Sequence, residues 1–361
     1  MARDVLSVPA AAAPSAIAGD GAGRDADARR PRRGRRLRWL LLAALVALGA
    51  VVLSMLVGGR PSTLAEVWHA VVTPTGSVMD VTIRELRWPR TVTGVVVGAC
   101  LGVAGVLVQG HTRNPIADPG LLGINQGAAL AIVSATAMAG ALAPLTQALL
   151  AFAGALVAVV AVFLVSTSAR GGATPITLVL AGAAISSLCT GLVSGIVLMD
   201  DQALDALRFW QVGSVAVRNG SLEVIAPFLL VGMVLAVANV GALNALSLGE
   251  DTARSLGVPV PVARTVGILA ITLLAGSAVT HAGPIAFAGL LVPHLARALV
   301  GADYRWLVPV GAVAGVAVLL LADTAGRVIA RPGELSVGVV LAVVGAPFFV
   351  HLARRRRLAT T

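Results

Sequence analysis

The sequence contains no lysine and little charge of either sign. Only 12% of its 361 residues are charged, about half of the usual share in a soluble domain, and 57% are hydrophobic. A soluble fold cannot bury that much apolar surface. The absence of lysine excludes a P-loop, and neither a His-Glu-x-x-His segment nor a nucleophile elbow occurs. The sequence therefore predicts a protein that is not an enzyme.

Cysteine and histidine are also scarce. Cys100 and Cys189 lie far apart within apolar runs, which indicates small core residues rather than a disulfide or a metal site. No two of the histidines have the spacing of metal ligands, so we expect them in loops or helix interfaces. They are His69, His111, His281, His294 and His351. We expect neither a metal nor a cofactor.

The net charge of +10 raises the alternative of a nucleic-acid-binding protein. The arginines, however, cluster at the chain ends and in short loops, and aromatic residues make up only 4% of the chain. A membrane protein that follows the positive-inside rule explains this distribution better. We therefore expect no nucleic-acid partner.

Long apolar runs dominate what remains. Stretches of roughly 20 residues, the length of a membrane-spanning helix, recur between Leu37 and Leu352. Because the runs are continuous rather than alternating, they favour helices over a barrel. The sequence predicts an all-α polytopic membrane protein with about ten transmembrane helices. Their predicted starts are Leu37, Thr91, Ile124, Leu145, Pro175, Leu222, Pro261, Gly283, Tyr304 and Leu335.

The chain ends predict the orientation in the membrane. Residues 1–36 are rich in Ala, Gly, Asp and Arg and are expected to form a disordered cytoplasmic tail, and residues 37–361 form the transmembrane domain. The apolar run after the tail is too long for a signal peptide. An even number of spans and arginine runs at both ends place both termini in the cytoplasm. The opposite face also holds an unexpected excess of arginine, namely Arg60, Arg84, Arg87, Arg90, Arg208, Arg218, Arg327 and Arg331.

An internal repeat is visible. Residues 90–92 and 115–122 are echoed by residues 264–266 and 284–291. The second and seventh predicted spans are an odd number of crossings apart, so the two units would be inverted in the membrane, as is typical of transport proteins. Chance similarity in apolar sequence remains the alternative.

Few polar or special residues interrupt the spans. Asp323 is the one serious candidate for a buried carboxylate, and its spacing from Arg327 predicts a local ion pair on one helix face. This weakens the case for a proton- or sodium-coupled carrier. Gly94, Gly98 and Gly102 recur every four residues, which predicts the close approach of another helix.

Residues 246–258, between the sixth and seventh predicted spans, form a short amphipathic pattern. We expect one helix whose apolar side chains pack downward and whose charged side chains face a partner. The apolar ones are Leu248, Leu256 and Val258, and the charged ones are Glu250, Asp251 and Arg254. A helix lying on lipid would show a similar pattern, and both alternatives stay open.

The chain resembles the FecCD family of ABC-importer permeases, which includes the ferric-siderophore and vitamin B12 permeases. The resemblance extends from about Leu37 to the C-terminus. It rests on several motifs in the same order, at residues 86–90, 113–123, 248–250, 289–297 and 345–349.

The resemblance implies a fold like that of the B12 permease and a multi-pass location in the bacterial plasma membrane. It also implies partners: a second permease subunit, identical or different, two cytoplasmic ATPase subunits and an extracytoplasmic substrate-binding protein. ATP hydrolysis would belong to the ATPase. An iron–siderophore complex is the leading substrate, and cobalamin and haem are alternatives within the family. An ion-coupled secondary carrier is the competing class.

The resemblance further implies roles for individual residues. The segment that would sit in a cleft of the ATPase contains Leu248, Gly249, Glu250, Ala253 and Leu256. Asn114 and Ile116 would line a cytoplasmic constriction of the translocation path, together with Thr174, where the sequence departs from the family pattern. Arg87, Arg90 and Arg327 would receive carboxylates of the binding protein. The alternative is that these arginines snorkel to lipid headgroups.

Overall fold

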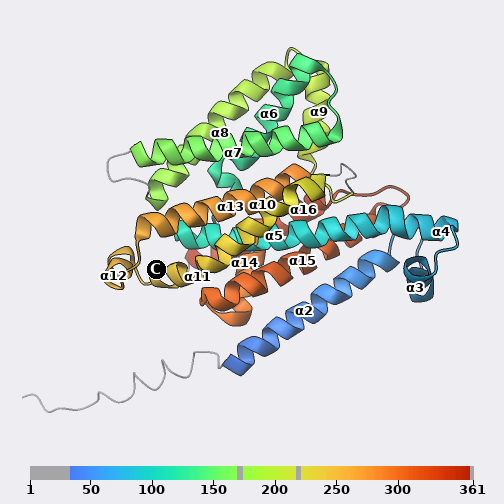
Figure 1. Cartoon of the computed structure of the whole chain (residues 1–361), viewed down its shortest axis with the longest axis horizontal. Helices are drawn as coiled ribbons and strands as arrows, with labels where there is room; N and C mark the ends of the chain where they lie inside the picture. Colours follow the sequence, from blue (N-terminus) through green and yellow to red (C-terminus); the bar gives the residue numbers. More distant parts are fainter. Residues whose placement is uncertain (1–32, 169–173, 217–220, 358–361) are drawn as a thin grey trace, which may run out of the picture.

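The structure is a computed structural model and describes residues 33–168, 174–216 and 221–357. These residues form helices and connecting turns, and no strand is assigned among them (Figure 1). The elements are α2 (Arg33–Leu56), α3 (Leu64–Val72), α4 (Val78–Val81), the π-helical η1 (Thr82–Arg87), α5 (Trp88–Thr112), the 3-10 helix η2 (Pro119–Leu122), α6 (Ile124–Ala139), α7 (Pro144–Ser168), α8 (Pro175–Val197), α9 (Asp201–Gln211), α10 (Ser221–Ala238), α11 (Val240–Leu246), α12 (Glu250–Ser255), α13 (Val260–Ala282), α14 (Ala288–Val300), α15 (Tyr304–Ile329) and α16 (Val337–Arg357).

The long helices lie side by side and give the molecule two ends, which we call the α12 end and the α3 end (Figure 1). At the α12 end, Asp303 before α15 accepts hydrogen bonds from Arg36 at the start of α2, at 3.0 Å, and from Asn244 of α11, at 3.1 Å. At the α3 end, Arg87 beside α5 donates to the carbonyl oxygen of Met55 in the last turn of α2. Successive long helices thus run back and forth between the two ends.

The predicted all-α polytopic fold is confirmed. Six helices among the described residues are long and apolar enough to cross a membrane alone, and α10 and α11 together add a seventh span bent by 46°. The shorter apolar helices α6, α14 and α16 account for the remaining predicted spans. The described residues therefore provide from six to ten crossings, depending on how the bent and short helices are counted.

Most predicted helix starts lie within a few residues of the observed ones. Two boundaries differ more. Helix α2 begins at Arg33, so residues 33–36 are helical and do not belong to the predicted tail, whose residues 1–32 lie outside the described part. The eighth span begins at Ala288 and not at Gly283, because Gly283, with φ +73°, ends α13.

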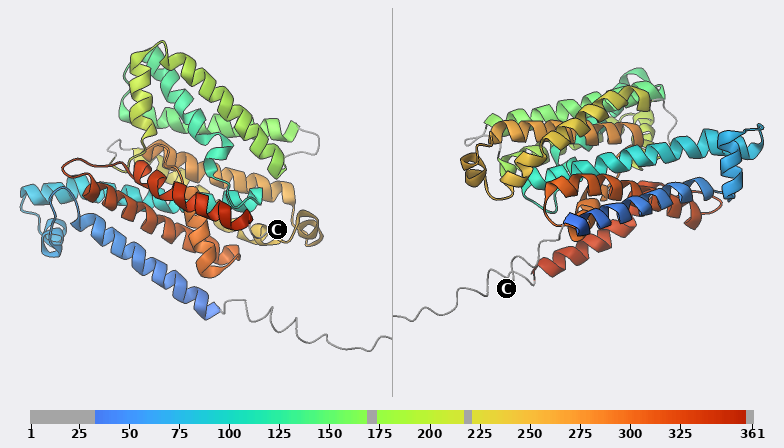
Figure 2. Two further views of the ribbon diagram at one scale, coloured as in Figure 1. Left: turned by 180° about the vertical axis from the view of Figure 1, so that it is seen from behind. Right: turned by 60° about the horizontal axis from the view of Figure 1, so that its bottom comes forward.

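Helices α5, α13 and α15 form the centre of the molecule, and α2 and the α6–α9 group lie outside them (Figure 2). The most apolar 18-residue window is 78% buried in α5 and in α13, against 22% in α2. Cys100 and Cys189 are both free and buried, which confirms their interpretation as core residues.

The glycines of α5 allow α15 to approach closely, as their spacing predicted. A Cβ atom at Gly98 would lie 2.6 Å from the carbonyl oxygen of Gly315, and one at Gly102 would overlap that of Gly311. A Cβ at Gly94 would overlap the side chain of Leu320, which also belongs to α15. Small residues therefore bring the backbones of α5 and α15 into contact.

Helices α5 and α13, which carry the first pieces of the predicted repeat, run antiparallel to each other. Thr93 near the start of α5 bonds His281 near the end of α13, at 3.0 Å between Oγ1 and Nε2. At the opposite ends, the ring of His111 lies against Gly267. This is the orientation that an inverted repeat requires. The origin of the two units as a repeat stays a prediction.

Candidate functional site

Arg87 is buried in the α3 end, where it binds the last turn of α2. Its Nη1 donates to the carbonyl oxygens of Met55 and Leu56, at 2.7 and 3.1 Å, and to Ser62 Oγ at 2.6 Å. Its Nη2 donates to the carbonyl oxygen of Arg60. These acceptors include the carbonyls that a helix end leaves without an intrahelical partner. Arg87 therefore caps α2.

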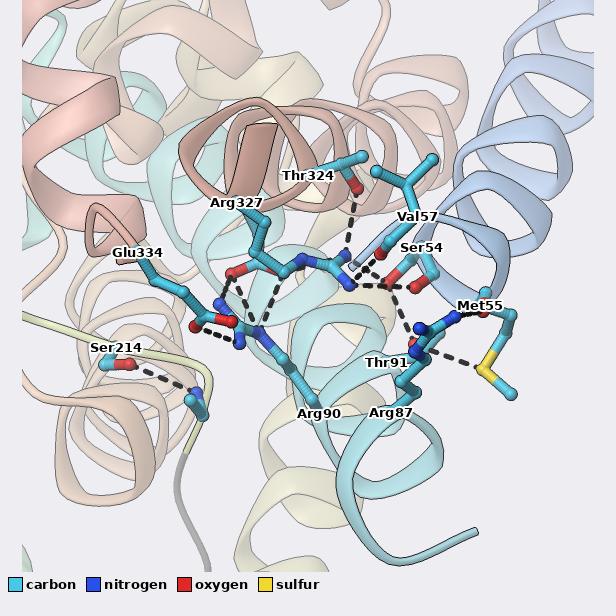
Figure 3. A network of polar contacts seen from close by, with 12 residues as sticks. Ser54, Met55, Val57, Arg87, Arg90, Thr91, Ser214, Thr324, Arg327 and Glu334 are labelled. Atoms are coloured by element: carbon cyan, nitrogen blue, oxygen red, sulfur yellow. Dashed lines mark hydrogen bonds and ion pairs between the residues drawn. The ribbon is translucent and has the colours of Figure 1, made fainter. Parts of the chain in front are cut away.

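Arg327, from α15, reaches the same helix end from the other side (Figure 3). Its Nη1 donates to the carbonyl oxygens of Ser54, at 3.0 Å, and Val57, and its Nη2 donates to Ser54 Oγ and Thr324 Oγ1. Its side chain is only 2% exposed. The negative end of the α2 dipole thus faces at least two guanidinium groups, an arrangement that stabilises both charge and helix.

Arg90 joins Arg87 and Arg327 in what we call the outer arginine cluster, where its side chain, 11% exposed, connects buried Asp323 to exposed Glu334. Its Nε and Nη2 bind both carboxylate oxygens of Asp323, at 2.8 to 3.1 Å, and its Nη1 donates to Glu334 Oε2 at 2.6 Å. Asp323 also pairs with Arg327 at 3.1 Å, which confirms the predicted ion pair. Asp323 is buried, whereas the Glu334 side chain is 46% exposed. Glu334 is therefore the exposed rim of the cluster.

The three arginines expected to dock a binding protein do come together at one end of the molecule. Sequence reasoning missed that each already has acceptors within the chain: the end of α2 for Arg87 and Arg327, and two carboxylates for Arg90. Only the spacing of Asp323 and Arg327 signalled any of these contacts. Of the outer arginines named from the sequence, Arg60, Arg84, Arg208 and Arg331 are exposed, and Arg218 lies outside the described residues. The docking role itself stays a prediction.

The segment expected to meet an ATPase lies at the α12 end, and its structure differs from the single helix predicted for residues 246–258. Helix α11 ends at Leu246, and α12 comprises only Glu250–Ser255. Gly249 separates the two with φ +117°, a conformation open mainly to glycine. Because the chain turns there, one helical periodicity does not apply across the whole segment.

Of the three apolar side chains predicted to pack downward, only Val258 does so, partly buried against the cluster that contains Leu246 and Ala253. Leu248 and Leu256 do not pack downward as predicted, but are 65% and 62% exposed. The buried residue is Ala253, which packs with Leu246 and Val260. The α12 end thus presents two leucine side chains outward.

Glu250 was expected to face outward toward a partner, but its carboxylate also connects α12 to α13. Its carboxylate pairs with Arg254, at 2.6 Å, and with Arg264 in the first turns of α13, at 3.2 Å. Asp251 and Arg254 are exposed as predicted. The second ion pair is a contact between α12 and α13 that the sequence pattern did not predict.

The residues expected at a constriction lie where α5 ends and α8 begins. Asn114 Oδ1 accepts a hydrogen bond from the backbone N–H of Ile116, at 3.0 Å, and the Ile116 side chain is exposed. Thr174 caps α8, where its Oγ1 accepts from the N–H of Thr177. Helix η2 packs on α8, with the carbonyl oxygen of Leu121 against Gly182. Their role in a path stays a prediction.

Among the residues that the structure describes, no three or more His, Cys, Asp or Glu side chains gather in a way that could hold a metal ion.

The chain was compared with known proteins and structures. The model of the FecCD transport family matches residues 43–355. The ferric enterobactin transport system permease protein FepD of Escherichia coli (strain K12) is 46% identical over 318 residues, which cover 88% of this chain and 94% of that protein. The iron(3+)-hydroxamate import system permease protein FhuB of Bacillus subtilis (strain 168) is 40% identical, covering 87% and 82%. The hemin transport system permease protein HmuU of Yersinia pestis is 37% identical, covering 88% and 94%.

A solved structure of a metal-chelate type ABC transporter, in an inward-facing conformation, has a similar fold. It aligns with a TM-score of 0.75 at 28% identity, covering 88% of this chain and 99% of that chain.

Proposed function

The chain belongs to the FecCD transport family, and we propose that it carries an iron–siderophore complex across the membrane. As a member of this family it is the permease subunit of an ABC importer and a multi-pass protein of the bacterial inner membrane. It is not itself catalytic, and the family implies a complex with an ATPase and a substrate-binding protein.

The substrate is proposed from one observation. The chain is more similar to permeases named for ferric enterobactin and iron(3+)-hydroxamate than to one named for hemin. The proposed substrate is therefore a ferric siderophore, with haem and cobalamin as the alternatives. The complete importer would contain a second permease subunit and two ATPase subunits.

The α12 end is proposed to be the cytoplasmic face. The arginine-rich start of α2 lies there. Helix α16 starts at the α3 end, where the N–H of Gly338 donates to the carbonyl oxygen of Gly213. It therefore ends at the α12 end, which brings the second arginine run to the same face (Figure 1). Arginine next to a span resists translocation. Both termini would then be cytoplasmic.

The segment from Leu248 to Leu256 is proposed to contact the ATPase. Its two exposed leucines suit an apolar cleft, and its charged residues suit the rim of one. Asn114, Ile116 and Thr174 are proposed to lie at the cytoplasmic constriction, because both segments are at or near the α12 end (Figure 1).

Arg90 is proposed as the centre of the docking site for the binding protein, with Arg87 and Arg327 behind it. Arg90 is the one of the three whose partner, Glu334, is exposed. A carboxylate of the binding protein that replaced Glu334 would gain a charge-assisted bond without leaving Arg90 unpaired. Arg87 and Arg327 would support the site by adding positive charge and by holding α2 in place.

The substrate is tested with the whole importer in liposomes. Uptake of a ferric catecholate, a ferric hydroxamate, haem and cobalamin is measured with the cognate binding protein, with and without ATP. We expect ATP-dependent accumulation of a ferric siderophore alone. Accumulation of haem or cobalamin, with no uptake of either iron chelate, would overturn the substrate assignment.

A further inference from the structure

Three buried polar side chains lie near the α12 end, where α5, α13 and the junction of α10 and α11 come together. His111 of α5 is 4% exposed, Asn239 between α10 and α11 is 3% exposed, and Arg264 of α13 is 7% exposed. Polar groups at such positions in spans are costly and are usually functional. No role described above uses His111 or Asn239.

Asn239 lies at the bend of 46° between α10 and α11. The helical hydrogen bonds continue on both sides of it, from its N–H to Leu235 and from the N–H of Leu243 to its carbonyl oxygen. Its Nδ2 donates to the carbonyl oxygen of Ala263 in α13, at 2.8 Å, and to Nε2 of His111 in α5, at 3.1 Å. One amide group thus ties the bend to two neighbouring spans.

The ring of His111 occupies a notch in α13 that only glycine can provide. A Cβ atom at Gly267 would overlap the ring, with Nε2 as the nearest atom. Nδ1 of His111 has no hydrogen-bond partner among the described residues. The position of the ring therefore depends on the notch and on the bond to Asn239.

An ion pair connects this part of α13 to α12. Arg264 directly follows Ala263, whose carbonyl oxygen accepts from Asn239, and Arg264 pairs with Glu250 at the start of α12 at 3.2 Å. A displacement of α12 would act on residues 263–264 through this ion pair. From there it would reach the bend through Asn239 and α5 through His111.

We infer that His111, Asn239 and Arg264 form a polar joint that transmits movement of α12 to the spans α5, α10 and α13. The inference rests on the proposed contact of α12 with the ATPase. The bend supplies a point at which α10 and α11 can change their angle, and the joint makes that angle depend on the position of α12. These are positioning residues, because they act through the helices and not on the substrate.

A polar contact that merely stabilises the fold would behave differently. Its loss would reduce the amount of folded protein, and uptake and ATP hydrolysis would fall together. Loss of a transmitting joint leaves hydrolysis running while transport fails. The ratio of substrate transported to ATP hydrolysed separates the two roles.

The test uses the complete importer in liposomes and compares Gly267→Ala and Asn239→Leu with wild type. The matched control is Gly276→Ala on the same helix, where a Cβ would meet only ordinary contacts of 3.7 Å or more. We expect the control to behave as wild type. In the two joint variants the substrate transported per ATP hydrolysed, measured on the folded, assembled importer, should fall by at least about fivefold, the lower end of typical coupling between sites.

A double variant distinguishes the effect of the steric clash at Gly267 from the effect of losing the hydrogen bond between His111 and Asn239. Gly267→Ala with His111→Ala removes the steric clash but also removes the bond to Asn239, so we expect it to fold and to stay uncoupled. Recovery of wild-type substrate per ATP in the double variant would overturn the joint, as would normal coupling in Asn239→Leu.

The variant Gly249→Pro at the start of α12 distinguishes failure of the polar joint from failure of the proposed contact between α12 and the ATPase. If Gly249→Pro uncouples transport and the joint variants do not, the inference is wrong and the contact of α12 with the ATPase stands. If Gly249→Pro leaves coupling normal, the proposed contact itself fails.

Discussion

Asp323 holds the outer arginine cluster together. It binds Arg90 through both carboxylate oxygens and Arg327 through one, while the end of α2 and the Thr324 hydroxyl accept hydrogen bonds from Nη1 and Nη2 of Arg327. Removal of one partner from a buried ion pair typically costs about 3–5 kcal/mol, because the other charge is left without compensation. Reversal of a buried arginine would therefore test folding as much as docking. Glu334, the exposed partner of Arg90, is the better place to test docking, because its side chain is 46% exposed.

The docking proposal predicts opposite effects for Glu334→Gln and Arg90→Gln. Loss of the Glu334 charge removes a competitor for Arg90, so the binding protein should bind more tightly. Arg90→Gln should weaken binding by at least about tenfold, since truncation of one partner of a charge pair costs about 2–5 kcal/mol. Affinity is measured at low and high salt with the purified permease complex.

Arg60→Gln serves as the control, because Arg60 is exposed and its side chain lies outside the pairs around Asp323. Unchanged affinity in Arg90→Gln, at either salt concentration, would show that Arg90 serves the fold and not the partner. Weaker binding in Glu334→Gln would rule out the exchange of carboxylates.

For individual residues, the sequence predicted side-chain contacts within one helix but not contacts between helices. The interval of four residues from Asp323 to Arg327 is enough to predict a pair. Two of the acceptors of Arg87 are the backbone carbonyls of Met55 and Leu56 in α2, 32 and 31 residues away in the chain. No side-chain pattern marks a backbone acceptor, so those contacts appear only once α2, α5 and α15 are placed together.

Helix α12 follows a residue in a backbone conformation that few residues other than glycine adopt. Gly249 adopts φ +117°, whereas proline is restricted to φ near about −65°. Gly249→Pro should therefore displace α12 and the two exposed leucines beside it. We expect uptake to be lost while the protein stays in the membrane. The measurements are uptake, ATP hydrolysis and the amount of ATPase that co-purifies.

Gly241→Ala is the matched control for Gly249→Pro, because Gly241 lies within α11 and a Cβ there would meet nothing within 4 Å. Normal uptake in both variants would mean that α12 does not transmit force from the ATPase. Glu250→Arg, which opposes Arg264 with a like charge, should uncouple as well.

Hydropathy predicted the helices well and their breaks poorly. Ile124, Pro175 and Tyr304 are starts both predicted and observed, because turn-forming residues precede a long apolar run there. The turn at Gly249 was missed because leucines continue on both sides of it, although glycine after a helix is a usual stop signal. The bend at Asn239 depends on partners in α5 and α13, which no local pattern reveals.

For the whole molecule, hydropathy did not predict which helices are central. The peripheral helices α2 and α7 have a higher mean hydropathy than the central helices α13 and α15. Lipid is as apolar as a protein core, so burial in a membrane is driven by close packing and polar contacts. The glycines of α5 were therefore a better guide to the centre than its leucines and valines. The repeat, read as inverted, likewise anticipated that α5 and α13 would run in opposite directions.

The arrangement of the two ends makes a prediction about the intact membrane. Arg36 at the start of α2 and the α11–α12 region share one end through Asp303, and the connection from α3 to α4 lies at the other. Reporter fusions that are active on one side of the membrane only are placed before α2, after Thr361 and at residues 74–76. We expect cytoplasmic signals at the two termini and an external signal at residues 74–76, because arginine runs flank the spans at both ends of the chain. Signals from opposite sides at the two termini would contradict an even number of crossings. An external signal at both termini would instead place α12 outside, away from any cytoplasmic ATPase, and would overturn the proposed coupling contact.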